Sequence, residues 1–576
     1  MIYCMTAMLS SSEHLARFLL RPALAPRPSE ASLPDAAAFS GFIREHKLPL
    51  DEVIAVNGLA QDPLLNAACL RDELSADRER HRAVREEFTA FREALDRDGI
   101  PHLLVKGVYG VPYRSDNIDI LIPDGDMARA GRILEGLGYI YNKFSYDRYK
   151  LLYNRLAGIR VTGIMHLHRL VGWYSPFITA RDLFAEAVDG SEAGVRLPRP
   201  EVSLAIIGAH ALYEDARIRL IDMHKVMTLL RQCDVDWPFV WRLAEHGGFA
   251  AGLALFFLVL EQQHRRLYDR PWFDVRFLEA ARKRLSFADG TRRHFYRYVA
   301  DRPLAADYRM SKYFVRRCLF LQVKRSGLIG PRAKARIAAD ILGAGMRQVS
   351  RVRPQPSMLI AICGPDGCGK TTQVQRMAAV FSSFEINARC SWARIGDSPL
   401  LNGLKALFRG RVRGAVPTAG GYTEGAFKSP LARRLWPCIA VPDYILRQYA
   451  AVFTGYLLQR AVIADRYHVD ALVDLAHRCG PEVLRQRWII AALRMLPRAH
   501  AAFVLQVPDA VLRQRRGDEY IPGVSDNATR FYAEAAEIFG ARIVDARQDA
   551  DALAEALCRD ALCAFMSRTK NYGPPL

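Results

Sequence analysis

The fold of the C-terminal part of this chain follows from one stretch, Gly364-Pro365-Asp366-Gly367-Cys368-Gly369-Lys370-Thr371. The stretch matches the pattern Gly-x-x-x-x-Gly-Lys-Ser/Thr in full, after an apolar run and before a run that is compatible with a helix. Glycines permit a tight loop whose backbone N–H groups face phosphate oxygens, and the helix that follows adds its positive N-terminal dipole. Because both flanks agree, a nucleotide site is favoured over a chance glycine-rich turn.

The residue types of this loop have distinct expected roles. Lys370 should reach the β- and γ-phosphates of ATP, and the Thr371 hydroxyl should hold Mg²⁺. The full set expected to bind ATP is Gly364, Asp366, Gly367, Cys368, Gly369, Lys370, Thr371 and Thr372. ATP is therefore the expected phosphoryl donor and Mg²⁺ the expected cofactor.

The sequence around the loop alternates between short apolar runs and helical stretches. The runs at 359–363, 462–464, 501–507 and 543–544 are bounded by Gly, Pro or Asp, as buried parallel strands are. Helical stretches such as 373–381 and 444–458 lie between them. This alternation predicts an α/β fold with a three-layer parallel sheet and a ligand at the carboxyl ends of its strands.

Three motifs give the region 357–570 a resemblance to thymidylate kinases. The loop resembles that of the family, and Ala461–Tyr467, which contains Asp465 and Arg466, looks like its strand ending in Asp-Arg-Tyr. The segment after Phe503 is similar to its strand and lid, with Arg513, Arg515 and Arg516 as the lid arginines. The resemblance implies that Asp465 holds Mg²⁺ through water, that Arg466 clamps an acceptor phosphate, and that a lid arginine closes over ATP. A surface salt bridge and a solvated helix face are the structural alternatives for these residues.

The acceptor itself stays open. The stretch His468–Asp474 lacks the Ser…Tyr-Gln pattern with which the family recognises thymine, and Trp392-Ala393-Arg394 matches no thymidine signature. We expect transfer of the γ-phosphoryl group to a nucleoside monophosphate such as dTMP or to a related small phosphorylated acceptor. The alternatives are an ATP-binding adaptor or switch with little turnover and a bifunctional nucleotidyltransferase–kinase.

The N-terminal half resembles a family of poorly characterised nucleotidyltransferases over about 75–300. The resemblance rests on Val105-Lys106-Gly107 and on the segment Tyr113–Ile122. It implies a degenerate site made of Lys106, Gly107, Asn117, Asp119 and His166. Asn117 stands where the family has its first aspartate, and His166-Leu167-His168 replaces Asp-Leu-His. With Asp119 as a lone carboxylate, we expect no nucleotidyl transfer.

His166 and His168 share one face of a strand and suggest a different metal. No third ligand is evident in the sequence, so ordinary residues of a half-exposed strand are the favoured interpretation of the pair.

Charge and composition set the remaining expectations. The chain has 576 residues and 81 Lys and Arg against 61 Asp and Glu, a net charge of +20, which indicates anionic partners. Residues 312–353 hold eleven basic residues and one acidic residue, and they end in Arg353-Pro354-Gln355-Pro356. We therefore predict an N-terminal helical region at 1–74, an α+β nucleotidyltransferase-like domain with a helical region at 75–305, a basic linker at 306–356, and the P-loop kinase-like domain at 357–576.

Other protein classes fit the sequence less well. Half of the residues are hydrophobic, which excludes a disordered chain, and the longest apolar run, Phe249–Leu260, is too short for a transmembrane segment. The eleven cysteines form no Cys-x-x-Cys pair, so a cytoplasmic location is expected. ATP and the acceptor are the expected partners, nucleic acid is not expected, and a homodimer stays open.

Overall fold

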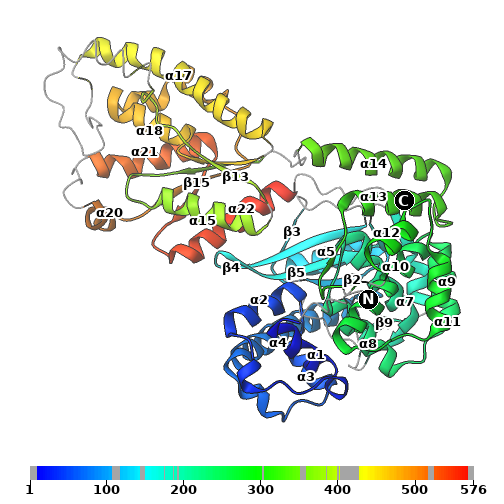
Figure 1. The fold of residues 1–576 in the computed structure, drawn as a ribbon. Helices are drawn as coiled ribbons and strands as arrows, with labels where there is room; N and C mark the ends of the chain where they lie inside the picture. Colours follow the sequence, from blue (N-terminus) through cyan, green and yellow to red (C-terminus); the bar gives the residue numbers. More distant parts are fainter. Residues whose placement is uncertain are drawn as a thin grey trace.

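The protein consists of two bodies joined side by side, seen in the computed structural model of Figure 1. One body holds the described residues up to 350, and the other holds the described residues from 358 onward. The structure describes residues 9–106, 117–142, 149–173, 175–185, 187–190, 194–300, 302, 304–350, 358–384, 386–398, 401, 427, 429–458, 460–516 and 524–567.

A parallel sheet of five described strands forms the centre of the C-terminal body. In sheet order the strands are β13 (Ala388–Trp392), β14 (Ala461–Asp465), β12 (Leu359–Cys363), β15 (Ala501–Gln506) and β16 (Arg542–Asp545). The central strand β12 is apolar throughout because it is buried on both faces: Leu359 and Ala361 enter one core, and Ile360 and Ile362 enter the other. The prediction of a parallel α/β sheet is confirmed.

Helices cover both faces of this sheet and make it the middle of three layers. One face carries α15 (Lys370–Ser383) and α22 (Ala550–Ser567). The other face carries α17 (Pro430–Leu457), α18 (His468–Cys479), α19 (Arg487–Arg494) and α21 (Val524–Phe539). A further helix, α20 (Asp509–Arg516), follows β15.

A second, mixed sheet lies in the N-terminal body. Its strands, in sheet order, are β1 (Leu103–Leu104), β2 (Ile118–Leu121), β5 (Arg160–His168), β4 (Lys150–Ala157) and β3 (Tyr139–Tyr141). Only β2 and β5 pair in parallel among these strands. Helices α4 (Ala68–Arg97) and α5 (Met127–Gly136) bury apolar side chains against one face of the sheet. The strands β1 and β2 pair in an antiparallel manner, with Lys106 shortly after β1 and Asp119 on β2.

A helical core fills the rest of the N-terminal body. The helices that contribute buried side chains to it are α1 (Ser11–Leu20), α2 (Ala36–His46), α3 (Leu50–Val56), α7 (Pro200–Ala209), α8 (Leu220–Gln232), α9 (Trp237–His246), α10 (Ala250–Tyr268), α11 (Val275–Arg284) and α12 (Thr291–Tyr298). Shorter elements connect them: α6 (Ala180–Ala185) and the strand pairs β6 (Val171–Trp173) with β7 (Ser175–Ile178), β8 (Ala187–Asp189) with β9 (Arg196–Pro198), and β10 (Arg217–Ile218) with β11 (Tyr308–Arg309). The first 74 residues thus share a core with residues beyond 200, and α4 runs across the predicted boundary at 74/75.

The segment predicted as a basic linker is largely helical. It forms α13 (Lys312–Arg325) and α14 (Pro331–Ser350). Phe314, Val315 and Leu319 of α13 are buried in the helical core, while the basic residues lie on other sides of the helix. The basic residues of α13 therefore mark the solvent-facing side of an amphipathic helix, and Ile337 and Ile341 of α14 also join the core of the N-terminal body. Residues 351–356 of the predicted linker lie outside the described residues.

The packing of α13 gives a prediction about stability. Leu319 is 2 % exposed, whereas Tyr313 on the same helix is 78 % exposed. Leu319→Ala should lower the free energy of unfolding by roughly 2 kcal/mol or more because it leaves a cavity in the core. Tyr313→Ala, the matched control, should change it by less than about 0.5 kcal/mol. Calorimetry of the full chain measures both, and equal, small effects would show that α13 is not part of the core.

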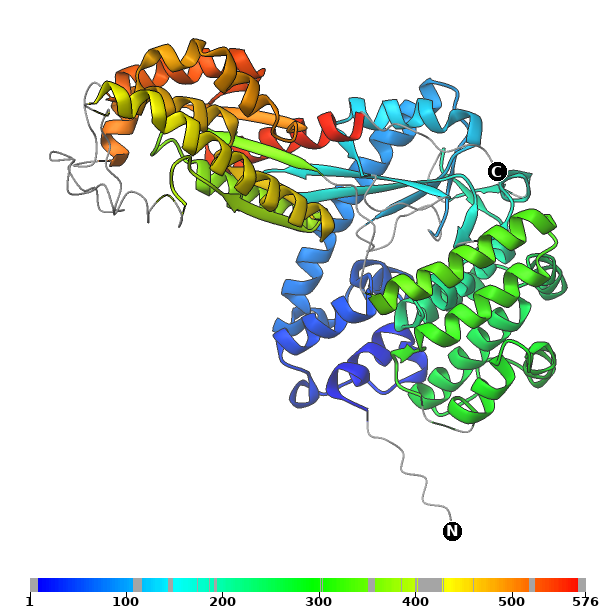
Figure 2. The ribbon, with the colours of Figure 1, turned by 90° about the horizontal axis from the view of Figure 1, so that it is seen from above.

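The two bodies meet where the N-terminal sheet reaches α15 and α22 (Figure 2). Ile140 and Leu156 of that sheet join the apolar cluster between α15, α22 and the parallel strands. Polar contacts frame this cluster: the Gly158 N–H donates to Glu555 over 2.6 Å, and the Arg559 guanidinium donates to the Gly138 carbonyl over 2.7 Å. The β4–β5 hairpin thus has one end in the N-terminal body and the other against the helix that begins at Lys370.

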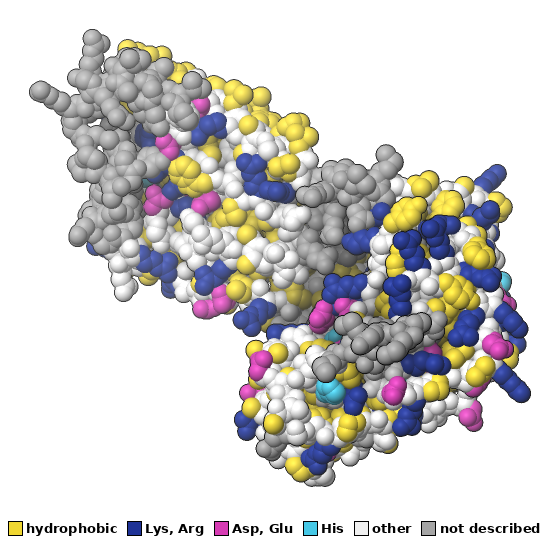
Figure 3. Space-filling view, viewed as in Figure 1, with side chains coloured by type: hydrophobic (Ala, Val, Ile, Leu, Met, Phe, Trp, Pro, Cys, Tyr) yellow, Lys and Arg dark blue, Asp and Glu magenta, His cyan; other side chains and the backbone are white. Residues whose placement is uncertain are grey.

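One long face of α17 is apolar and exposed. Leu435, Leu446, Phe453 and Leu457 are each more than half exposed, and Figure 3 shows hydrophobic side chains along this helix. No helix in the described part of the chain is both long enough and apolar enough to cross a membrane. The possible homodimer stays a prediction.

Candidate functional site

The loop between β12 and α15 has a backbone that requires its glycines. Gly364, Gly367 and Gly369 have φ values of 142°, 90° and 97°, in the region that L side chains rarely adopt. A Cβ atom at Gly364 would also lie 2.5 Å from the Leu505 carbonyl oxygen, closer than real Cβ contacts allow. The glycine spacing in the sequence therefore reflects the shape of the loop itself.

Lys370, the first residue of α15, bends back over this loop. Its ammonium donates to the carbonyl oxygens of Gly364 over 2.7 Å and Pro365 over 2.9 Å, and it lies 3.3 Å from Asp366 Oδ1. The side chain is only 6 % exposed. A buried positive charge is thus held at the loop whose backbone was predicted to bind phosphates.

Thr371 and Asp465 join the loop to the neighbouring strand. Asp465 ends β14 and pairs in register with Ile362 of β12, so it lies at the carboxyl end of the sheet. The Thr371 hydroxyl donates to Asp465 Oδ2 over 2.7 Å. The other carboxylate oxygen, Oδ1, is buried and has no hydrogen-bond partner among the described residues. A hydroxyl and a carboxylate oxygen are the ligand types that Mg²⁺ prefers, so these two residues fit the predicted ion.

Arg466 lies in a network of carboxylates beside the loop. It has a φ of 79°, and its guanidinium is paired with Asp366 and lies 3.8 Å from Asp470 Oδ1. Burial opposes ionisation of Asp366, but Lys370, Arg466 and Arg394 hold the pKa of this carboxyl well below its ordinary value. Asp366 is therefore ionised, and it connects the predicted ATP loop to the predicted acceptor clamp.

Two further carboxylates complete this network. Asp474 accepts from Arg394 at two positions, over 3.0 and 3.2 Å. Asp470 accepts from the Gly364 N–H over 3.2 Å and from the Tyr532 hydroxyl over 2.9 Å. The sequence patterns predict no role for Asp470 or Asp474, which lie four residues apart in α18 and therefore share one face of that helix.

The predicted lid arginines lie on α20. Arg515 is exposed and donates to the Gly367 carbonyl oxygen over 3.4 Å, which brings it to the loop. Arg513 is also exposed, and the side chain of Arg516 lies outside the described residues. Of the three arginines, Arg515 is the one with a described contact to the loop.

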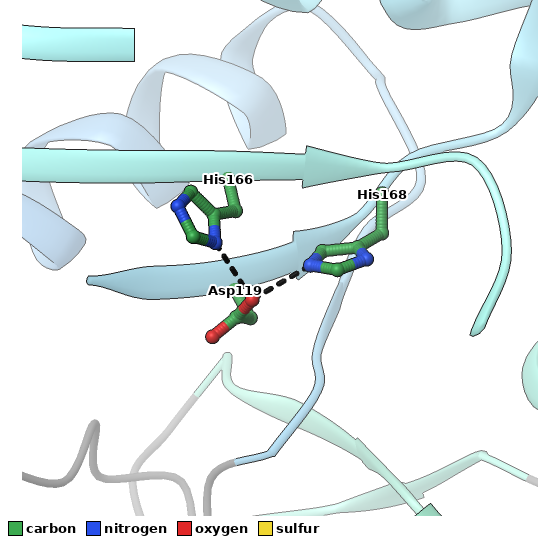
Figure 4. Close-up of side chains that lie close together, drawn as sticks. All are labelled: Asp119, His166 and His168. Atoms are coloured by element: carbon green, nitrogen blue, oxygen red, sulfur yellow. Dashed lines mark hydrogen bonds and ion pairs between the residues drawn. The ribbon is translucent and has the colours of Figure 1, made fainter. Parts of the chain in front are cut away.

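A second cluster forms around Asp119 in the N-terminal sheet (Figure 4). Asp119 on β2 lies opposite His166 on β5, and His168 follows two residues later on the same face. Asp119 Oδ1 lies 3.1 Å from His166 Nδ1 and 2.6 Å from His168 Nε2. Asn117 Nδ2 lies 2.8 Å from His166 Nδ1, and Gly107 is outside the described residues. Four of the five predicted residues, Lys106, Asn117, Asp119 and His166, therefore meet, and His168 belongs with them.

Basic and acidic side chains surround this cluster. The Lys106 ammonium lies 3.1 Å from Asp119 Oδ1 and 3.3 Å from Glu214, which also pairs with Lys150 over 2.8 Å. Burial opposes the charge of Asp119, but Lys106 and His166 hold its pKa well below the ordinary value. Burial lowers the pKa of His168 to about 4, so this imidazole is neutral at neutral pH.

Comparisons with known proteins give one family match and a similarity to a solved structure. Residues 57–263 match the model of a family described as uncharacterised nucleotidyltransferases, so the chain contains a nucleotidyltransferase-family domain. Among solved structures, a thymidylate kinase from Ehrlichia chaffeensis is 16 % identical over 35 % of this chain and 95 % of its own, with a TM-score of 0.22. A comparison with curated proteins gives no match.

Proposed function

We propose that this protein is an ATP-dependent phosphotransferase whose C-terminal body transfers the γ-phosphoryl group to a nucleoside monophosphate or a related small phosphorylated acceptor. The observation that carries the proposal is the pair Thr371–Asp465, in which one buried carboxylate oxygen has no partner among the described residues. A buried carboxylate oxygen without a partner is costly in free energy unless a cation meets it. Such a carboxylate beside a glycine loop is the arrangement that magnesium-dependent phosphoryl transfer needs.

Each residue of the loop has a role in this reaction. The backbone N–H groups and the N-terminus of α15 bind phosphate oxygens, and Lys370 neutralises charge that develops on the γ-phosphate. Thr371 and Asp465 would hold Mg²⁺, which supplies further charge neutralisation at the phosphates. Arg515 contacts the Gly367 carbonyl of the loop, and a closing arginine there would screen the site from water.

The charged network beside the loop supports a small phosphorylated acceptor. Arg394 and Arg466 are guanidinium groups, which bind phosphate in a bidentate manner, and Asp474 and Asp366 hold them in fixed positions. Carboxylates such as Asp366 also accept hydrogen bonds from hydroxyl groups. An acceptor with one phosphate and several hydroxyls, such as a nucleotide or a sugar phosphate, therefore suits this network.

The direct test is a phosphoryl-transfer screen with the full-length protein. ATP and Mg²⁺ are supplied with a panel of nucleoside monophosphates and sugar phosphates, and release of ADP is measured with and without each acceptor. We expect at least one acceptor to increase ADP release and to gain a phosphoryl group. ATP binding with no response to any acceptor would favour the ATP-dependent switch instead.

If Arg466 binds the phosphate of the acceptor, replacing it should affect the acceptor more than ATP. Arg466→Lys keeps the charge beside Asp366 but loses the forked geometry, so the KM for the acceptor should rise by about tenfold or more. The KM for ATP should change by less than about threefold, since the loop keeps its own contacts. Arg434→Ala, an exposed arginine on α17, is the control and should change neither constant. If Arg466→Lys raised the KM for ATP as much as the KM for the acceptor, Arg466 would not be the residue that binds the acceptor phosphate.

The bifunctional alternative takes its support from the family match at residues 57–263. The motif positions around Asp119 hold Asn117 and His166 in place of carboxylates. We therefore keep the expectation that the N-terminal body does not transfer nucleotides with Mg²⁺.

A further inference from the structure

The cluster around Asp119 brings together three metal-binding side chains from two central strands. Asp119, His166 and His168 each offer one ligand atom, and these atoms all lie within 4.8 Å of one another. In a tetrahedral site with bonds of about 2.1 Å, neighbouring ligand atoms are about 3.4 Å apart. Asp119 Oδ1 lies 3.1 Å from His166 Nδ1, near that separation, and 2.6 Å from His168 Nε2, which is a direct hydrogen bond. Binding of an ion would therefore replace this hydrogen bond and move the two atoms apart by about 0.8 Å.

The chemistry of these donors does not fit the ion that a nucleotidyltransferase domain is expected to bind. Mg²⁺ requires an octahedral set of oxygen ligands and is usually bound through carboxylates and phosphates. Here two of the three donors are imidazole nitrogens, and Asn117, at the position of the family's first aspartate, contributes a neutral amide next to His166. Imidazole and carboxylate together suit zinc, iron, nickel and related first-row ions.

The backbone holds this arrangement in place. His166 and His168 are two residues apart on β5, so both side chains leave the same face of the strand, and Asp119 is in register with His166 on the parallel strand β2. On the opposite face, Ile118, Ile120 and Met165 are buried in the apolar core. The three donors are therefore fixed by a packed sheet, which lowers the cost of assembling a metal site.

Lys106 currently provides the positive charge at Asp119. Its ammonium is shared between Asp119 and Glu214, over 3.1 and 3.3 Å. An incoming cation would therefore compete with Lys106 for Asp119. The displaced ammonium would keep Glu214 as a partner, so the exchange leaves no buried charge without its counter-ion.

We propose that Asp119, His166 and His168 bind one divalent transition-metal ion, Zn²⁺ or an ion of similar ligand preference, in exchange for the Lys106 ammonium. His166 binds through Nδ1, His168 through Nε2 and Asp119 through Oδ1. Three protein ligands leave further coordination positions for water or a ligand, which is typical of catalytic rather than purely structural zinc sites.

Titration of the chelator-treated full-length protein with Zn²⁺ tests the proposal. We expect one Zn²⁺ per chain, with an affinity that falls by about a hundredfold or more in the double variant His166→Gln, His168→Gln. His14→Gln, an exposed histidine on α1, is the matched control and should bind as the wild type does. Circular dichroism and the unfolding temperature establish that the double variant is folded. Equal Zn²⁺ affinity in the folded double variant and the wild type would overturn the site.

The chain also contains eleven cysteines, and cobalt distinguishes them from the proposed ligands. Co²⁺ bound by two imidazoles and a carboxylate shows visible absorption without a thiolate charge-transfer band. A thiolate charge-transfer band in the spectrum of the wild-type protein with Co²⁺ would overturn the proposal, because it would show that cysteine binds the ion. Mg²⁺ that displaces Zn²⁺ at an equal concentration would also overturn it.

The exchange with Lys106 has its own test. Lys106→Met removes the competing ammonium, so Zn²⁺ should bind about tenfold more tightly than in the wild type. Unchanged or weaker binding in the folded variant would contradict the exchange.

Discussion

Replacing Lys370 with alanine should lower the rate of phosphoryl transfer from ATP by about two orders of magnitude or more. The Lys370 ammonium is buried and donates to carbonyl oxygens of its own loop, so in the described arrangement it is held ready beside the phosphate-binding backbone. When a triphosphate binds, this charge can follow the γ-phosphate, on which negative charge is redistributed during transfer. The ammonium therefore stabilises the transition state more than it stabilises the fold.

Two further variants separate charge from packing at this position. Lys370→Met keeps most of the side-chain volume, and we expect it to lose as much activity as Lys370→Ala. Lys324→Ala, an exposed lysine on α13, should retain wild-type turnover. Steady-state rates and unfolding temperatures are measured for all three. Wild-type turnover in Lys370→Ala would contradict the assignment of this loop to ATP.

The parallel sheet of the C-terminal body could be predicted because its signal is local. A strand that is buried on both faces is continuously apolar, and β12, β14 and β15 are short runs of this kind with turn residues at their ends. The loop after β12 needs glycine at positions of positive φ, so the glycine spacing in the sequence also predicts the shape of the loop. Both features depend on neighbouring residues rather than on distant contacts.

The linker prediction illustrates the opposite case. Eleven basic residues between 312 and 353 indicate a solvated segment, but a helix can place all of its charges outward and still bury its other side. Phe314, Val315 and Leu319 do so against a core made by helices far away in the sequence. Charge counting could not distinguish a linker from such a helix, since the partner surface is formed by tertiary packing.

Only part of the Asp119 cluster could be predicted, because the spacing of its two histidines is local and the position of Asp119 beside them depends on strand pairing. The alternation His166-x-His168 places two imidazoles on one face of a strand, which the sequence states directly. Which strand pairs with β5, and in which register, is a long-range property, and only that register brings Asp119 opposite His166. The sequence therefore predicts Asp119 as a site residue but does not connect it to the histidine pair.

Replacing Asp465 with asparagine should also reduce phosphoryl transfer by about two orders of magnitude, and it should raise the Mg²⁺ concentration needed for half-maximal ATP binding by about tenfold or more. Asparagine is nearly the same size and keeps an oxygen that can accept from Thr371, so the contact to α15 can persist. It loses the negative charge and the second carboxylate oxygen, which is the buried atom without a partner among the described residues. The loss should therefore appear in the response to Mg²⁺ rather than in stability.

Thr371 provides the matched pair for this experiment. Thr371→Ser keeps the hydroxyl that donates to Asp465 Oδ2 and should remain close to the wild type, whereas Thr371→Val removes the hydroxyl and should behave like Asp465→Asn. ATP binding is followed by calorimetry over a range of Mg²⁺ concentrations, and transfer rates are measured in parallel. If Asp465→Asn lost activity with an unchanged Mg²⁺ response, Asp465 would act on the fold or on the acceptor. If Thr371→Val also needed the same Mg²⁺ concentration as the wild type for half-maximal ATP binding, the ion would have to be held elsewhere. The hydroxyl and the carboxylate are adjacent parts of one site, so both substitutions should change this concentration.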